Sequence, residues 1–179
     1  ALLPTNRDSQ IALLAQSKLR LLRSFKGRVP LQVEGAQDRV HRISFRMNDR
    51  KIILRGRVNR TPVEFVLDTG SELTALSRAT ARDARVTPVT ATISAGVGAA
   101  TLHRLELGRA DTIEVGSLRV NNVPVAIRTV ARSTLPRWQT ESFSPLSLGF
   151  SVVVDYERKE MLLARTLPDG VADFRLPMR

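Results

Sequence analysis

The sequence predicts an all-β domain, a small closed-barrel fold, with a helical extension at its N-terminus. Gly and Pro are scattered through residues 55–150, between short apolar stretches. The apolar side chains are mostly Val, Leu, Ile and Ala, and only 4% of the chain is aromatic. Many short strands separated by turn signals at close spacing are typical of small barrels. The hydrophobic fraction of 42% is sufficient for a packed core.

Residues 9–25 are expected to form the helix. Thr5 and Asp8 give a start signal, and Gly27 and Pro30 give the end. Lys18, Arg20 and Arg23 lie largely opposite the apolar side chains. The helix packs on its own domain or is the tail of a preceding helical region. Being basic and amphipathic, it is also suited to lie on a membrane or to dock on a partner. The apolar residues that recur at helical spacing are Ile11, Leu14, Ala15, Leu19, Leu22 and Phe25.

From about residue 40 the apolar residues alternate with polar ones, which predicts strands. Residues 43–47 alternate, Asn48-Asp49 signals a turn, and the apolar residues 52–54 follow. Residues 63–67 alternate again and lead to Asp68-Thr69-Gly70.

In the second half of the chain, Ser77 is placed to cap a short helix over residues 78–85. Residues 131–145 are expected to form a loop, and a last hairpin joins residues 152–156 to 161–163. Further strands are expected at 88–94, 101–108, 111–119 and 122–130. Turns are expected at Gly96–Gly98, Gly108-Arg109, Gly116-Ser117 and Asn121-Asn122. This gives a helical extension over 1–38, a β domain over 39–165, and a tail or linker over 166–179.

The composition excludes several kinds of site. Without cysteine there is no disulfide, thiolate metal site or thiol nucleophile. His41 and His103 are the only histidines, so we expect no metal, no cofactor and no Ser/His/Asp triad. No apolar run approaches the roughly 20 residues that span a bilayer.

The formal net charge is +11, from 28 Lys and Arg against 17 Asp and Glu. The basic residues are spread along the chain without interleaved aromatic residues, so a solvated basic surface is expected and no specific nucleic-acid site. The alternative is a basic interaction protein for nucleic acid or anionic surfaces, which predicts strongly salt-dependent binding.

Asp68 follows an apolar strand and precedes Thr69, Gly70 and Ser71, an arrangement suited to a catalytic carboxylate. Gly70 permits a sharp turn and the close approach of another backbone. The Thr69 hydroxyl can bond across a symmetric interface, and Ser71 can bond the outer carboxylate oxygen.

Hydrolysis without a metal needs a base and an acid, and two carboxyls that share one proton supply both. Since the sequence holds one such motif, the second carboxyl must come from another copy.

Together with the strands and turns around Asp68-Thr69-Gly70, the segment of about residues 50–165 resembles the retropepsin-like aspartic proteases, in their bacterial single-domain branch. The resemblance implies an acid protease fold with Asp68 as the catalytic residue. It assigns support of the active loop to Thr69, Gly70, Ser71, Leu148 and Gly149. It assigns the substrate-binding flap to Ala95, Gly96, Val97 and Gly98. The chain departs from the family pattern at two places. Only two residues separate Gly149 from the next strand, where the family usually has a short helix. Arg60 stands where the family commonly has Gly.

The resemblance implies an aspartic endopeptidase that acts on peptide or protein substrates. Its partner is a second copy of the domain, as a homodimer or as a second protease-like half outside this chain. The shared proton implies acid-leaning activity, and the resemblance implies a periplasmic or secreted protein. The alternative is a non-catalytic peptide- or protein-binding module that retains the fold.

Overall fold

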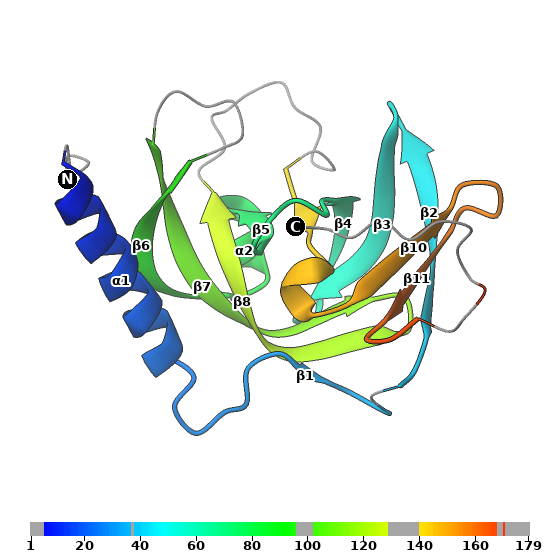
Figure 1. Cartoon of the computed structure of the whole chain (residues 1–179), viewed down its shortest axis with the longest axis horizontal. Coiled ribbons are helices and arrows are strands. Elements are labelled where there is room, and N and C mark those ends of the chain that lie inside the picture. The colour runs from blue at the N-terminus through cyan, green and yellow to red at the C-terminus, as the bar shows by residue number, and fades with distance from the viewer. Residues whose placement is uncertain (1–5, 37, 96–101, 129–139, 168–169, 171–179) are drawn as a thin grey trace.

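The computed structural model describes residues 6–36, 38–95, 102–128, 140–167 and 170. It is an all-β fold with a long helix at its N-terminus, and Figure 1 shows that helix beside a strongly curved sheet. In chain order the elements are α1 (Arg7–Arg23), β1 (Gln32–Val33), β2 (His41–Asn48), β3 (Lys51–Val58), β4 (Thr61–Leu67), β5 (Thr74–Ser77), α2 (Arg78–Asp83), β6 (Thr87–Ala95), β7 (Leu102–Val115), β8 (Leu118–Arg128), β9 (Ser142–Phe143), the 3-10 turn η2 (Leu146–Leu148), β10 (Ser151–Asp155) and β11 (Glu160–Ala164).

The helix α1 begins at Asn6, because the Asn6 side chain accepts a hydrogen bond from the Ser9 backbone N–H at 2.8 Å. The expected start signal at Thr5 lies outside the described residues. The helix packs on β6, where the hydroxyl of Ser17 donates to that of Thr92 at 2.8 Å. Packing on its own domain, one of the interpretations of this helix, is therefore confirmed.

The strands follow the order β10-β11-β2-β3-β4-β9-β5-β8-β7-β6, and β1 pairs with β8. An additional pairing of β3 with β7 closes β3, β4, β9, β5, β8 and β7 into a ring. It is not a clean barrel, because β2 and β7 share one edge of β3, with β2 on residues 51–54 and β7 on residues 56–58. The strands β2, β11 and β10 therefore continue away from the ring, as the right side of Figure 1 shows.

Two expected turns are wrong, because β7 continues through Gly108-Arg109 and β8 continues through Asn121-Asn122, although Asn122 has a φ of +55°. Gly108 instead allows close packing within the sheet. A Cβ atom at Gly108 would lie 2.8 Å from Ile127 Cδ1 and 3.0 Å from the Thr87 carbonyl oxygen. The turn at Gly116-Ser117 is confirmed, and Gly116 has a φ of +56° there.

The two hairpins at the sides of the sheet agree with the alternating pattern. β2 and β3 pair around Asp49 and Arg50, whose φ values of 46° and 62° are typical of a type I′ turn, one residue later than expected. β10 and β11 form the expected last hairpin. The described end of the expected 131–145 loop contains a strand, β9, parallel to β4.

The core lies inside the ring. Phe65 on β4 and Phe143 on β9 are both fully buried, with ring centroids 6.0 Å apart. On α2, the predicted cap is confirmed, because the Ser77 hydroxyl accepts a hydrogen bond from the Thr80 N–H at 3.1 Å. The buried aromatic pair and the pairing of β4 with β9 fix the position of the end of β4, and therefore of the segment that follows it.

Candidate active site

Asp68 lies directly after β4 and is held by its neighbour β9. Its backbone N–H donates to the Phe143 carbonyl at 2.9 Å, which continues the parallel pairing of β4 with β9 by one residue. Its side chain is half-buried, and Oδ1 accepts a hydrogen bond from the Gly70 N–H at 3.2 Å. Such an Asx turn fixes a carboxylate against its own loop while leaving lone pairs free. Among the described residues no donor bonds the second oxygen, Oδ2.

Ser144 joins the loop after Asp68 to the segment after β9. The Ser144 hydroxyl donates to the Ser71 carbonyl at 2.5 Å, and its N–H donates to the Thr74 hydroxyl at 3.1 Å. Ser144 and Thr74 are both fully buried. Because buried hydrogen-bonded groups are costly to separate, these two bonds rigidify the loop over residues 71–74.

Sequence reasoning missed Ser144, although a local signal is present. Ser144 precedes Pro145, and three residues later the Ser147 N–H approaches the Ser144 hydroxyl at 3.4 Å. A Ser followed by Pro is typical of the start of a helical turn, here η2. That signal predicts the turn, but nothing local predicts the bond to Ser71, which is 73 residues away.

The role expected of Ser71 is not the one that the structure shows. Its hydroxyl donates to the Leu73 carbonyl at 2.8 Å, which is a bond within its own loop, instead of to the outer oxygen of Asp68. A hydroxyl often bonds a backbone group two residues away, so the nearer acceptor is favoured. Thr69 is exposed, and its expected bond across a symmetric interface stays a prediction.

Gly70 is exposed and has no positive φ. A Cβ atom there would meet only Asp68 Oδ1, at the ordinary contact distance of 3.8 Å, among the described residues. The described part of this protomer therefore gives no steric reason for glycine at this position. A close approach by a second chain or a substrate would give one.

Leu148 and Gly149 lie on η2 and its end. Leu148 is 2% exposed and belongs to the core, and Gly149 ends the turn with a φ of +74°. The hydrogen bonds to the Asp68 loop come from Phe143 and Ser144. The family pattern is expected to place a short helix after Gly149. In this chain the short helical element is η2, which comes before Gly149, and β10 begins two residues after it.

The predicted flap is only partly covered by the described residues. β6 and β7 pair as an antiparallel hairpin as far as Ala95 with Leu102. Gly96, Val97 and Gly98 lie outside the described residues. Their assignment to the flap stays a prediction.

Glu141 is a buried carboxylate that no local sequence pattern marks, because apart from the adjacent Thr140 hydroxyl its donors are distant in the chain. It is 4% exposed. Its side chain accepts hydrogen bonds from the Ser77 N–H at 2.6 Å and the Thr80 hydroxyl at 2.7 Å, at the start of α2. Its carbonyl accepts from the Val66 N–H at 2.9 Å. Glu141 thereby links α2 to the strand that carries Asp68.

Other kinds of site find no support within the described ranges. No group of three or more His, Asp or Glu side chains there is arranged to bind a metal. His41 is a core residue, 1% exposed. The sequence contains no nucleophile-elbow motif that could supply a serine nucleophile to a triad. Two open cavities of about 350 and about 280 Å³ are lined by residues of the β1 and α2 regions, apart from the Asp68 loop. No helix among these residues has the length and apolarity to span a membrane.

Comparison with known proteins identifies one family. The family model described as "Aspartyl protease" matches residues 54–152, more than half of the chain. No curated protein matches the chain. Among solved structures, a retropepsin-like aspartic protease from Rickettsia conorii is similar at 17% identity with a TM-score of 0.47, covering 74% of this chain and 92% of that one. The residues matched by the family model include Asp68 and run from Leu54 within β3 to Val152 within β10.

Proposed function

The chain belongs to the aspartyl protease family, and we propose from this premise that it is an aspartic endopeptidase whose catalytic carboxylate is Asp68. The observation that supports the proposal most directly is the position of Asp68 within the matched segment. It directly follows the half-buried strand β4, on a loop held by Phe143 and Ser144. Its Oδ1 accepts a hydrogen bond from its own loop, and no donor among the described residues bonds Oδ2.

The chemistry requires a second carboxyl close to the first. One carboxylate takes a proton from water as the water attacks the peptide carbonyl, and the other, protonated, donates to the carbonyl oxygen. Two nearby carboxyls cannot both ionise easily, so the pair retains one proton and titrates as a unit. This division of roles needs neither a metal nor a covalent intermediate.

We propose that the second carboxyl is Asp68 of a second copy of the domain. The exposure of Thr69 and Gly70, with no close contact around a Cβ at position 70, supports an approach of another chain at this loop. A twofold axis through the loops would bring the two identical carboxyls together, and twofold dimers are the commonest oligomers. Peptides or unfolded proteins are the proposed substrates, and the compartment implied by the resemblance is the periplasm or the exterior.

The first test replaces Asp68 with Asn, which preserves shape and removes the acid–base function. With an unfolded, alkylated protein as substrate and cleavage followed by mass spectrometry, Asp68→Asn should lower the rate by about a hundredfold to ten-thousandfold. The matched control is Asp49→Asn, since Asp49 is exposed in the β2–β3 turn at a φ of 46° that Asn also tolerates. This control should retain wild-type activity.

The pH dependence of the same assay tests the shared proton. The rate should rise toward acid pH and fall where both carboxyls are protonated or both ionised. A flat profile between about pH 3 and 9 would count against the dyad. If wild type and Asp68→Asn are equally inactive but bind unfolded peptides equally well, the chain is a binding module that retains the fold.

A further inference from the structure

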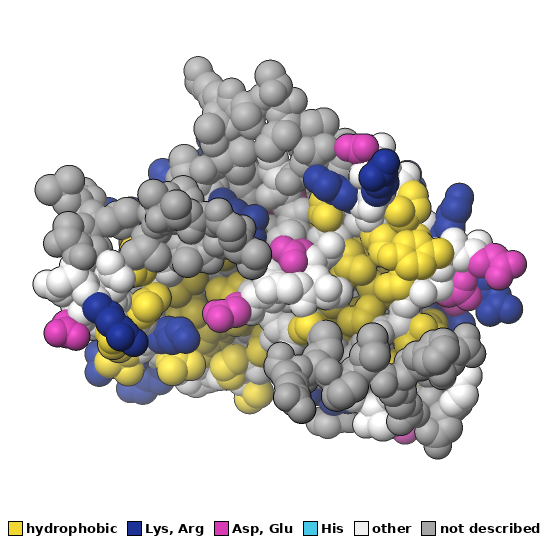
Figure 2. All heavy atoms as spheres, turned by 45° about the horizontal axis from the view of Figure 1, so that its top comes forward, with side chains coloured by type: hydrophobic (Ala, Val, Ile, Leu, Met, Phe, Trp, Pro, Cys, Tyr) yellow, Lys and Arg dark blue, Asp and Glu magenta, His cyan; other side chains and the backbone are white. Residues whose placement is uncertain are grey.

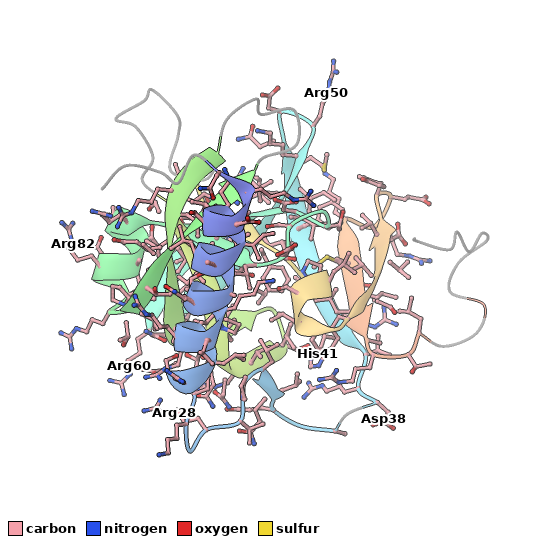
Figure 3. All side chains as sticks on the ribbon, turned by 60° about the vertical axis from the view of Figure 1, so that its left-hand side comes forward. Arg28, Asp38, His41, Arg50, Arg60 and Arg82 are labelled. Carbon is pink, nitrogen blue, oxygen red and sulfur yellow. The ribbon has the colours of Figure 1, made fainter. Side chains whose placement is uncertain are left out.

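The helix α1 leaves a face uncovered after it packs on the domain. Its packed face contains Leu14, Ser17 and Leu21, with Ser17 1% exposed against β6. Phe25, just beyond the helix, is also buried, and the Arg109 guanidinium lies over its ring at 5.9 Å. These contacts lie on one side of the helix, and the other side of α1 faces away from the sheet, toward the viewer in Figure 3.

Large apolar side chains lie on the uncovered part of α1. Ile11 is 53% exposed, Leu19 46% and Leu22 66%. At 3.6 residues per turn, they fall with the exposed Ala15 within about 80° of the helix circumference. We call this set, Ile11, Ala15, Leu19 and Leu22, the α1 stripe. About half or more of each of Ile11 and Leu22, and nearly half of Leu19, stays exposed within the domain, so these exposed apolar atoms gain free energy only when something else covers them.

Basic residues border the α1 stripe on both sides. Lys18 lies next to Ile11 around the helix, and Arg23 lies beyond Leu19. Arg7 and Arg20 add two further charges, and the helix has one acidic residue in its first turn, Asp8, which falls within the same sector of about 80° as the stripe. No ion pair joins these four cations to another residue in the described part of the chain.

The same combination continues past the end of the helix. Val29 is 64% exposed, and Lys26 and Arg28 next to it are exposed basic residues. Arg28 makes one ion pair, with Asp111 at 3.4 Å. On the left of Figure 2, the side on which Figure 1 places α1, apolar side chains lie among Lys and Arg side chains.

We propose that α1 binds the protein to an anionic lipid surface, lying in the plane of the interface with the α1 stripe toward the acyl chains. An anionic lipid surface has a layer of charged headgroups above a layer of acyl chains. The Ile and Leu side chains of the stripe would lie among the acyl chains, and the Lys and Arg side chains beside them would lie at the headgroup phosphates. Nucleic acid would attract the cations but offers no site for exposed Ile and Leu side chains. Two copies of this face would also repel each other, because the Lys and Arg side chains beside the α1 stripe would lie close to those of the other copy.

Vesicle sedimentation with the whole chain tests the proposal. The protein should sediment with phosphatidylcholine vesicles that contain about 30% phosphatidylglycerol, and not with pure phosphatidylcholine, and salt should weaken the binding. The double variants Ile11→Ser/Leu22→Ser and Lys18→Gln/Arg23→Gln should each weaken it about tenfold or more. The matched control Arg60→Gln/Arg82→Gln removes the same charge from exposed sites on other elements and should change binding less than about twofold.

The absence of cysteine from the chain allows a second measurement at single sites. An environment-sensitive dye on Leu22→Cys should shift to shorter wavelength with anionic vesicles, and the same dye on Arg82→Cys should not. Equal loss of binding in the Arg60/Arg82 control, or no effect of the Ile11/Leu22 change, would overturn the proposal in favour of general electrostatic attraction. Self-association that only the Ile11/Leu22 variant loses would assign the α1 stripe to a second copy instead.

Discussion

At the residue scale, His41 joins three elements of the core. It lies on β2, 1% exposed, with its ring edge-on to Phe150 at 5.9 Å between centroids. Its Nδ1 is 3.4 Å from the Ser117 hydroxyl, in the β7–β8 turn. Burial lowers the pKa of His41 below 6.5. A hydrogen bond with the Ser117 backbone raises it in part, and the charge of Arg39 lowers it again.

The lowered pKa predicts a loss of stability in acid. As the pH falls through 6.5, His41 of the unfolded chain takes up a proton while the folded chain keeps its histidine neutral, so the free energy of unfolding decreases. The loss ends once the pH is below the folded pKa. One proton limits the slope to about 1.4 kcal/mol per pH unit.

Urea unfolding at pH 8, 7, 6 and 5 measures this effect in wild type and in His41→Gln. The variant lacks the titrating group and fits the core less well, so it should be the less stable protein at pH 8. The difference in unfolding free energy between the two proteins should then shrink on acidification, because all other titrations cancel in it. A difference that stays constant from pH 8 to 5 would show that the pKa of His41 is the same in the folded and unfolded states.

At the scale of elements, the ring depends on the contact between β3 and β7 at Gly56. Gly56 pairs with Val63 of β4 on one side and Val115 of β7 on the other. A Cβ atom at position 56 would lie 2.3 Å from the Glu114 carbonyl oxygen and 3.0 Å from the Phe65 ring. Because one of these neighbours is backbone, the strand itself would have to move.

Gly56→Ala should therefore lower the free energy of unfolding by about 3 kcal/mol or more, measured by urea denaturation. The matched control is Gly70→Ala, where the added methyl meets only Asp68 Oδ1 at 3.8 Å among the described residues. That control should unfold like wild type but lose activity, if another chain must approach Gly70. Equal stability of Gly56→Ala and wild type would mean that β3 and β7 do not pair as closely as described.

The elements show which parts of the fold the sequence can predict. Alternation predicted β2, whose residues are buried and exposed in turn, because a strand in a half-buried sheet has a period of two. The turn predicted at Gly108 is wrong, because glycine also occurs where strands pack closely, and the sequence does not distinguish the two uses. β9 is two residues long and therefore too short for a periodic signal.

The candidate site divides in the same way. Asp68 was found because its motif is local, three consecutive residues after an apolar strand. Ser144 and Glu141 escape prediction because the partners that tie them to the Asp68 loop and to α2 are more than 60 residues away, and only the closed ring brings them together. The expected bond from Ser71 to Asp68 failed because Leu73 offers a nearer acceptor, which depends on loop geometry that the residue types leave open.

At the scale of the whole molecule, the chain contains one Asp-Thr-Gly motif, and the proposed chemistry needs two carboxyls. The proposal of two identical copies makes a quantitative prediction for mixed subunits. A pair formed by one wild-type chain and one chain with the Asp68→Asn substitution lacks the second acid–base group and should be inactive. With random pairing, the activity per wild-type chain then equals the wild-type fraction of all chains.

Mixing wild type with Asp68→Asn should accordingly lower the activity per wild-type chain to about half in an equal mixture, and to about a quarter with a threefold excess of variant. The mixtures are held until subunits have exchanged, at concentrations where sedimentation shows pairs, and an unrelated protein at the same mass replaces the variant in the control. Activity per wild-type chain that does not change on mixing would show that the second carboxyl does not come from another copy. The effect of Asp68→Asn alone would still hold, so the identity of the catalytic residue and the origin of its partner are tested separately.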